Sequence, residues 1–498
     1  MNENRLKASE AIVQSLSALA IGLLALQTGF VYAWPSYNLA NFVSNETVLS
    51  APISTLQVSL LGSLPNLGGF IGMPVCGWIF STLGRKYGSM LFGVPYLVAW
   101  LIISLTNNIT LILIAVTIAG TGIAGQNIST MFMSEIAHVS IRGGLTSISS
   151  SAYMTGLLLA NIMGGQFDYM TIIIINLSVS VLTIMLLSLI RDSPVFLVLV
   201  GREEDAAKSI AFYRRLDVNS DQVKAEVDKI RNTMDPKLET LLQEKELGQE
   251  LDLKIADSLI EKTEVNKKKE NISAWRFLLR SKSSKRILVI LLTMIAMTIL
   301  TGGIILQVYT EPLFAEAAPS MSANQCAIFA AINSFISSLV NMVVIDRLGR
   351  KAILMVTTAS TGICTGLLGL QLQLHFAPHW FTVVLINVYA FMYTAGPATI
   401  PFVLASEVFL PEVGSLCNTF CYSFVWPFFF IALSVFPPIV EFLGLGPIFY
   451  IFCFMSFAVF LFSLFYLPET KAHAGLWGYD KRADVSLDSK VLQQHMDA

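Results

Sequence analysis

Charged side chains stand at the ends of long apolar runs, in a pattern typical of ion pairs between helix ends. The segment Leu83-Gly84-Arg85-Lys86 separates two apolar runs and recurs 265 residues later as Leu348-Gly349-Arg350-Lys351. Glu135 closes another apolar run, and Arg142-Gly143 follows it by seven residues. Because an unpaired charge in apolar surroundings costs several kcal/mol, we expect Arg85, Glu135 and Arg142 to form an ion-pair cluster.

The second half of the chain repeats this pattern with one cation fewer. We expect Asp346, Arg350 and Glu407 to form a similar cluster, but Gly414, not a cation, stands seven residues after Glu407. Such clusters can tie neighbouring helices together in one conformation and release them in another. A simpler reading stays open, in which these charges only anchor helix ends at a membrane surface.

The composition places these charges in a membrane protein. The 498 residues are 54% hydrophobic and 13% charged, against about 25% charged residues in an ordinary soluble domain. Of the 32 Lys and Arg, 20 lie between Arg191 and Arg286. Five long stretches lack both residue types, and each is long enough for an even number of spans of about 20 residues. They are residues 8–84, 87–141, 143–190, 287–346 and 352–470.

Two spans in each of the first four stretches and four in the last give twelve. Even numbers of spans return the chain to one side, which the positive-inside rule identifies as the cytoplasm. The expected organisation is therefore a cytoplasmic N-terminus (1–10), six spans (11–190), a cytoplasmic loop with short amphipathic helices (191–286), six further spans (287–467) and a cytoplasmic tail (468–498). The acceptor triplets at Asn45 and Asn108 fall outside in this topology and predict N-glycosylation.

Metal and catalytic chemistry have little support in the sequence. The six cysteines form no paired motif, and we interpret them as small apolar residues, with no metal ion and no cofactor expected. With five His, no nucleophile–base pair at usable spacing and no phosphate-binding loop, we expect no enzyme. The partners expected are a small-molecule substrate and the lipid bilayer, with no nucleic acid and no obligate protein partner.

An ordered set of motifs resembles the sugar porters of the major facilitator superfamily, with insect facilitated trehalose transporters and animal glucose transporters most similar. The motifs cover nearly the whole chain: Gly84-Arg85-Lys86, Glu135 to Arg142-Gly143, Asp192-Ser193-Pro194, Asp346 to Lys351, Gly396-Pro397 with Glu407, and Leu467-Pro468-Glu469-Thr470-Lys471. The resemblance implies an all-α polytopic membrane protein with the major facilitator fold. Twelve helices would form two six-helix bundles, with a helical cytoplasmic loop between them and alternating access to a central site.

The resemblance also implies roles for individual residues. The inner latch of the family would comprise Gly84, Arg85, Lys86, Glu135, Arg142, Asp346, Arg347, Gly349, Arg350, Lys351, Glu407 and Glu469. Proton-coupled members place Asp where this chain has Gln27, and no acid lies deep in an expected span, which argues against proton coupling and favours a facilitator. The expected location is the plasma membrane, with both termini in the cytoplasm.

The expected substrate positions depart from the family pattern. Where hexose carriers have amides in the seventh span, alignment on Tyr309 gives Thr298, Ile299 and Ile304. An alternative register lets Gln307 take over a polar role. Amides lost to Ile should weaken hexose binding, because each sugar hydroxyl must replace its bonds to water. The full expected set is Gln27, Ser150, Thr298, Ile299, Ile304, Asn333, Thr394, Phe402 and Trp426.

The leading hypothesis is a facilitative transporter of a sugar such as trehalose or a hexose. The same fold carrying a less polar organic solute is the near variant. A non-transporting receptor that signals through residues 191–286 is the alternative of another class.

Overall fold

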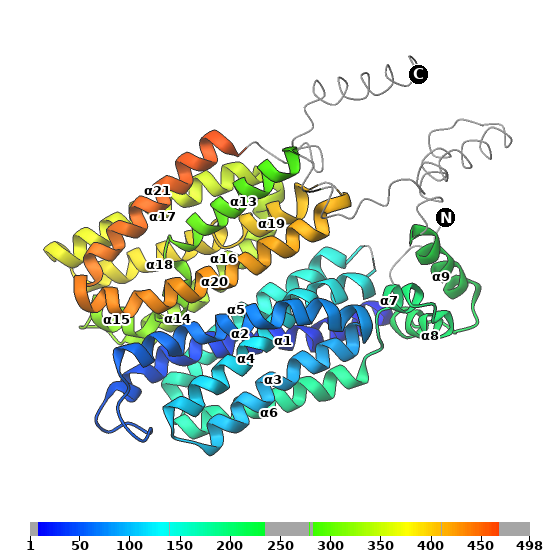
Figure 1. Ribbon diagram of the computed structural model, residues 1–498, viewed down its shortest axis with the longest axis horizontal. Coiled ribbons are helices and arrows are strands. Elements are labelled where there is room, and N and C mark those ends of the chain that lie inside the picture. The colour runs from blue at the N-terminus through cyan, green and yellow to red at the C-terminus, as the bar shows by residue number, and fades with distance from the viewer. Residues whose placement is uncertain (1–7, 139, 235–277, 279–281, 410, 468–498) are drawn as a thin grey trace, which may run out of the picture. The chain divides into compact units, whose positions relative to one another are not determined.

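Every regular element in the described part of the chain is a helix. The structure is a computed structural model, and it describes residues 8–138, 140–234, 278, 282–409 and 411–467 (Figure 1). The first six long helices are α1 (Ala8–Val43), α2 (Thr55–Thr82), α3 (Arg85–Leu105), α4 (Ile109–Ile136), α5 (Arg142–Gln166) and α6 (Tyr169–Leu189). Three short helices follow: α7 (Pro194–Leu199), α8 (Glu203–Arg214) and α9 (Asp221–Met234).

The second set of helices begins at Lys282. It comprises α13 (Lys282–Ile299), α14 (Gly303–Val308), α15 (Thr310–Ala317), α16 (Ala323–Leu348), α17 (Arg350–Leu374), α18 (His379–Ala395), α19 (Ile400–Glu407), α20 (Pro411–Leu443) and α21 (Leu445–Tyr466). Among the described residues, ten helical segments are long and apolar enough to cross a membrane. The protein is a multi-pass membrane protein.

Two of the twelve expected spans do not meet the criteria of length and hydropathy. One is α5, which is rich in Ser and Gly, and the other is the seventh span, which is broken into α13, α14 and α15. The first contains many polar side chains, and the second interrupts the helical backbone. Such features are tolerated at membrane depth where they face protein or a water-filled cavity.

Contacts divide the chain into two units. Unit 1 comprises residues 1–271, 304–338 and 429–442, and unit 2 comprises residues 272–303, 339–428 and 443–498. Unit 1 therefore contains α1–α9 together with α14, α15 and parts of α16 and α20. The expected division into two bundles at residues 191–286 stays a prediction.

Small residues allow the helices of unit 1 to cross closely. A Cβ added to Gly29 of α1 would lie 2.5 Å from the Tyr153 carbonyl oxygen of α5, and one added to Gly156 would overlap the Leu26 carbonyl. Lipid provides no hydrophobic force between helices, so close packing of this kind must provide the attraction. The crossing of α1 and α5 therefore fixes the depth of Tyr153 relative to α1.

The seventh span is interrupted by a glycine with positive φ. Gly302 has φ 88°, and a Cβ there would overlap the Phe452 ring in unit 2. The Thr301 carbonyl, which lies at the break, accepts a hydrogen bond from the Tyr389 hydroxyl at 2.8 Å. The tenth span breaks between α18 and α19, where Gly396 packs against Thr357. Side chains thus satisfy or cover the backbone at the breaks, as helix interruptions in a membrane require.

The helices α7, α8 and α9 form a small apolar cluster of their own. Its buried members include Phe196, Ala206, Ile210, Val223 and Val227. The sequence predicted short amphipathic helices in residues 191–286, and 194–234 contain three of them. Residues 235–277, with the lysine triplet at 267–269, lie outside the described residues.

Candidate functional site

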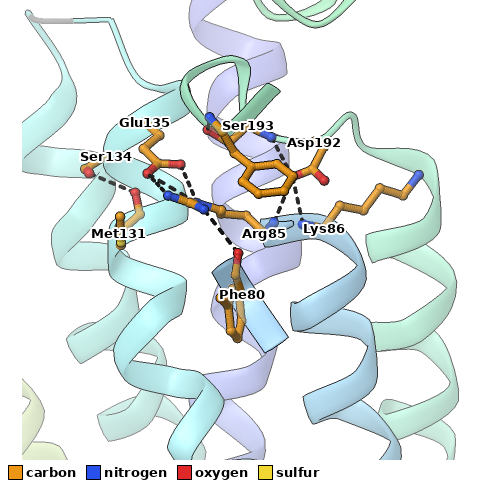
Figure 2. A network of polar contacts seen from close by, with 9 residues as sticks. Phe80, Arg85, Lys86, Met131, Ser134, Glu135, Asp192 and Ser193 are labelled. Carbon is orange, nitrogen blue, oxygen red and sulfur yellow. Dashed lines mark hydrogen bonds and ion pairs between the residues drawn. The ribbon is translucent and has the colours of Figure 1, made fainter. Parts of the chain in front are cut away.

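Arg85 and Glu135 form the centre of a polar cluster in unit 1. Arg85 is the first residue of α3, and Glu135 is the penultimate residue of α4. The Arg85 Nη2 and Nε atoms donate to the Glu135 Oε1 and Oε2 atoms at 2.9 and 3.0 Å, and both side chains are 8% exposed (Figure 2). Arg85 Nη1 donates to the Phe80 carbonyl at 3.1 Å, and its guanidinium lies 5.0 Å from the Phe196 ring centroid. This bidentate pair joins α3 to α4 and places α7 over both.

Asp192 caps the start of α3. Its Oδ1 atom accepts the backbone N–H groups of Arg85 at 2.9 Å, Lys86 at 3.0 Å and Ser193 at 2.7 Å (Figure 2). The first N–H groups of a helix have no partner within the helix, and a carboxylate there also meets the positive end of the helix dipole. Gly84 has φ 92°, and a Cβ there would overlap the Asp192 carboxylate. The glycine therefore permits both the turn and the cap.

Arg142 does not join the cluster. It begins α5 and is exposed, and its guanidinium makes no hydrogen bond or ion pair with the residues that the structure describes. The latch expected from Arg85, Glu135 and Arg142 thus contains only the first two in this structure, with Asp192 as an additional member. Because all of these residues belong to unit 1, the cluster holds α3, α4 and the start of α7 together within that unit.

The second copy of the repeated segment forms the same local contacts. Gly349 has φ 90°, as Gly84 has φ 92°, and each glycine precedes a helix. Arg350 Nη1 donates to the carbonyl five residues earlier, that of Ile345, as Arg85 does to Phe80. Lys351 Nζ donates to the Leu464 carbonyl at 2.9 Å, and Lys86 Nζ to the Ser188 carbonyl at 2.7 Å. The repeated segment is therefore one structural corner used twice, once in each unit.

Four latch positions cannot be compared between the halves. The side chains of Asp346, Arg347 and Glu407, and the whole of Glu469, lie outside the described residues. Their expected roles stay predictions.

A second ion-pair cluster joins α8 to α1. Arg214 of α8 donates through Nη2 to Glu226 Oε1 at 2.7 Å, and its Nη1 lies 3.6 Å from Glu10 Oε1. Two further hydrogen bonds lie close by, from Gln14 Nε2 to the Tyr213 carbonyl at 3.2 Å and from the Tyr213 hydroxyl to the Arg191 carbonyl. Burial raises the pKa of Tyr213 far above its usual range, and the nearby Asp192 raises it further. Tyr213 therefore stays a neutral donor, and α8 is fixed to the end of unit 1 that carries Arg85.

Of the expected substrate positions in unit 1, Gln27 is fully enclosed. Its Nε2 donates to Thr183 Oγ1 at 2.9 Å, and its Oε1 accepts from Ser180 Oγ at 2.6 Å. These contacts use the amide to join α1 to α6. Ser150 is exposed on α5, Ile304 is buried at the start of α14, and Asn333 is half-buried on α16.

The remaining expected positions belong to unit 2. Thr298 and Ile299 are buried at the end of α13, and the Thr298 hydroxyl donates to the Ile295 carbonyl of its own helix. Thr394 and Trp426 are buried, and Phe402 stacks on Tyr422 with ring centroids 5.2 Å apart. The described side chains at these positions therefore offer more apolar surface than amide groups.

The comparisons with known proteins agree with this geometry. The sequence profile of the family described as "Sugar (and other) transporter" matches residues 11–474. The chain belongs to this family. A facilitated trehalose transporter of Drosophila virilis is 24% identical over 476 residues, covering 92% of this chain and 47% of that protein. The counterpart of Polypedilum vanderplanki is 24% identical over 466 residues, covering 92% of this chain and 86% of that protein.

This member of the sugar transporter family spans about half the length of the first curated relatives that it matches. Solved structures show the fold. The partially occluded inward-open xylose transporter XylE from E. coli has a TM-score of 0.70 at 18% identity, covering 93% of this chain and 99% of that chain. XylE bound to 6-bromo-6-deoxy-D-glucose, titled a major facilitator superfamily proton:xylose symporter, has a TM-score of 0.65 at 18% identity. The expectation of a major facilitator fold is confirmed.

Sequence reasoning missed several polar contacts at the other end of this family member's unit 1. The Tyr309 hydroxyl lies 3.4 Å from the carbonyl oxygens of Val58 and Leu433, and a Cβ on Gly62 would overlap it. Asn324 donates to the Asn161 carbonyl at 3.0 Å and to Glu311 Oε2 at 3.2 Å. Ser36 Oγ accepts the Glu311 N–H at 2.9 Å.

Deeper in unit 1, the Tyr153 hydroxyl donates to Gln307 Oε1 at 2.8 Å. Most of these contacts attach the segment from α14 to α16 to α1, α2 and α5, while Asn324–Glu311 joins α16 to α15 and Tyr309–Leu433 reaches α20. The one sequence signal for them is the alternative register that gave Gln307 a polar role.

Proposed function

We propose that the chain is a facilitative transporter of a sugar such as trehalose or a hexose, working by alternating access. Family membership supports transport, and two of the relatives that it matches are named facilitated trehalose transporters. The repeated corner at Gly84 and Gly349 supports two related halves, as inverted or parallel repeats do in many transporters.

The main support for uniport, which is transport without a coupled ion, is the residue type and surroundings of Gln27. A proton-coupled mechanism needs a titratable group along the pathway. Gln27 is an amide that cannot titrate, and it is enclosed by Thr183 and Ser180. The carboxylate of Glu135 is paired with Arg85 at a helix end. The states of Gln27 and Glu135 therefore support movement of a neutral solute without a coupled proton.

The proposal includes a topology. Residues 11–190 and 287–467 would form the two six-helix bundles, and the N-terminus, residues 191–286 and the tail from 468 would be cytoplasmic, in the plasma membrane. Asn45 and Asn108 would then face outward, and both are exposed in the structure. Asn108 also caps α4 through a hydrogen bond from the Thr110 N–H, so a glycan there would meet an ordered helix start.

Uptake into proteoliposomes tests the proposal directly. Purified protein should exchange labelled trehalose, glucose or another hexose against unlabelled sugar inside, with a rate that saturates. An imposed pH gradient should leave the initial rate unchanged. Flux equal to that of empty vesicles for the whole sugar panel would refute the sugar assignment, and flux that follows the pH gradient would refute uniport.

A less polar organic solute is the second candidate. Ile299 and Ile304 are buried, and the Thr298 hydroxyl is used within its own helix, so these positions offer no amide to a sugar hydroxyl. Sites of this composition lose little when a substrate lacks hydroxyl groups. Thermal stabilisation by apolar solutes alone would favour this candidate, because a bound ligand raises the unfolding temperature with its concentration.

A further inference from the structure

The Tyr153–Gln307 contact joins the two spans that are least suited to contact lipid. Tyr153 lies 11 residues into α5, or about 17 Å along a helix of about 37 Å. Gln307 lies in the short α14, between the break at Gly302 and the non-helical Tyr309. Both side chains are half-buried and both belong to unit 1. Transporter sites typically form at such discontinuous helices near the middle of the membrane.

The side-chain amide of Gln307 has a donor group that the described residues leave unused. Gln307 Oε1 accepts from the Tyr153 hydroxyl, whereas Gln307 Nε2 carries two N–H donors. No residue in the described part of the chain accepts from Nε2, and this atom is not among the fully buried atoms that lack a partner. These two donors therefore remain available to a polar solute.

The surroundings of the pair are aromatic. The Tyr32 ring meets the Tyr153 ring edge-on, with centroids 6.2 Å apart, and the Tyr32 hydroxyl donates to Asn66 Oδ1 at 2.7 Å. Small-molecule sites are commonly lined by aromatic side chains with a few placed polar groups. The exposed Ser150 lies one turn before Tyr153 on α5.

We propose that Gln307 is a substrate-binding residue that recognises a hydroxyl group through Nε2, and that Tyr153 positions its amide. This inference rests on the proposed function, since it requires a polyhydroxylated substrate. The expected positions Thr298, Ile299 and Ile304 have no side-chain amide. In this proposal Gln307, two residues before Tyr309, supplies the amide in their place. Tyr153 holds the Gln307 carbonyl oxygen and thereby directs the two N–H donors away from α5.

The opposing explanation is that the pair only ties α5 to α14. Two single variants separate the explanations. Tyr153→Phe and Gln307→Leu both break the same tether, but only Gln307→Leu removes the Nε2 donors. Loss of a tether alone would therefore affect sugar binding equally in both variants.

The experiment measures thermal stabilisation by glucose and trehalose, together with KM and Vmax for exchange in proteoliposomes. We expect Gln307→Leu to raise KM by about tenfold, the effect of losing hydrogen bonds to a substrate hydroxyl. We expect Tyr153→Phe to change KM by less than about threefold. The double variant should resemble Gln307→Leu, because the positioning residue has nothing left to position.

Tyr450 and Gln373 provide a matched control. The Tyr450 hydroxyl donates to Gln373 Oε1 at 3.1 Å in an exposed position of unit 2. Tyr450→Phe and Gln373→Leu should leave KM unchanged. Equal KM changes in Tyr153→Phe and Gln307→Leu, or no change in either, would overturn the inference while sugar transport by the wild type stands. A wild type that neither binds nor exchanges any sugar would overturn the proposed function, and this inference with it.

Discussion

The buried Arg85–Glu135 pair makes a quantitative prediction about unit 1. Replacing Arg85 by Met removes all three hydrogen bonds to Glu135, the bond to the Phe80 carbonyl and the ring contact with Phe196. The side chains are only 8% exposed, so the Glu135 carboxylate is left in place without its partner. Breaking a buried pair in this way costs about 3–5 kcal/mol. Glu135→Leu should cost a similar amount, because it leaves the guanidinium uncompensated.

The double variant Arg85→Met/Glu135→Leu should cost less than the sum of the two single variants, and less than either of them. It leaves no unpaired charge, and well-packed apolar replacements of buried pairs are often close to neutral. The measurement is a double-mutant cycle: the unfolding temperatures of the wild type, the two single variants and the double variant are compared in the same detergent. Arg142→Met is the control, since Arg142 belongs to the same motif but is exposed, and it should change stability by less than about 0.5 kcal/mol. Strict additivity of the two single effects would refute the pairing argument.

Three further predictions concern glycines and a carboxylate. Gly84→Ala should destabilise the fold strongly, because φ 92° is unfavourable for Ala and its Cβ would overlap the Asp192 carboxylate. Gly143→Ala is the control, since a Cβ there meets open space. Equal unfolding temperatures for the two variants would contradict this prediction. Gly156→Ala should separate α5 from α1 and lower both stability and exchange rate, whereas Gly77→Ala, with nothing within 4 Å of its Cβ, should lower neither. Glu311 is a further carboxylate of unit 1, and its Oε2 accepts from Asn324 at 3.2 Å; because uniport needs no titrating group, Glu311→Gln should leave the exchange rate independent of an imposed pH gradient, and a pH-driven flux of the wild type that disappears in this variant would refute uniport.

Charge placement allowed the helix corners to be predicted from the sequence. Gly-Arg-Lys after an apolar run indicates a short turn followed by a new helix, and Gly84 and Gly349 both adopt the positive φ that such a turn uses. The pairing of Arg85 with Glu135 could also be predicted, because Arg85 begins one span and Glu135 ends another on the predicted cytoplasmic side. The exposure of Arg142 could not be predicted from the sequence. Its distance from Glu135 along the chain does not fix the direction in which the first turn of α5 points.

Contacts between distant segments were harder to predict. Asp192 follows Arg85 by 107 residues and caps α3 only because α6 returns the chain to the same end of unit 1. The sequence contains the Asp-Ser-Pro motif but does not say which helix start it serves. The same limit applies to Gln27, whose partners Thr183 and Ser180 lie more than 150 residues away on α6.

The break in the seventh span explains why the position of the missing amide was ambiguous. A continuous helix presents residues at fixed intervals of 3.6 per turn, so alignment on Tyr309 would place Ile304 and Thr298 on a defined face. The positive φ of Gly302 and the non-helical Tyr309 interrupt that periodicity on both sides of α14. The direction of the Gln307 side chain consequently does not follow from the helical phase of α13, and the hydrogen bond from Tyr153 of α5 helps to fix it. A polar residue that is out of register in the sequence can therefore meet a polar partner on another span in the folded chain.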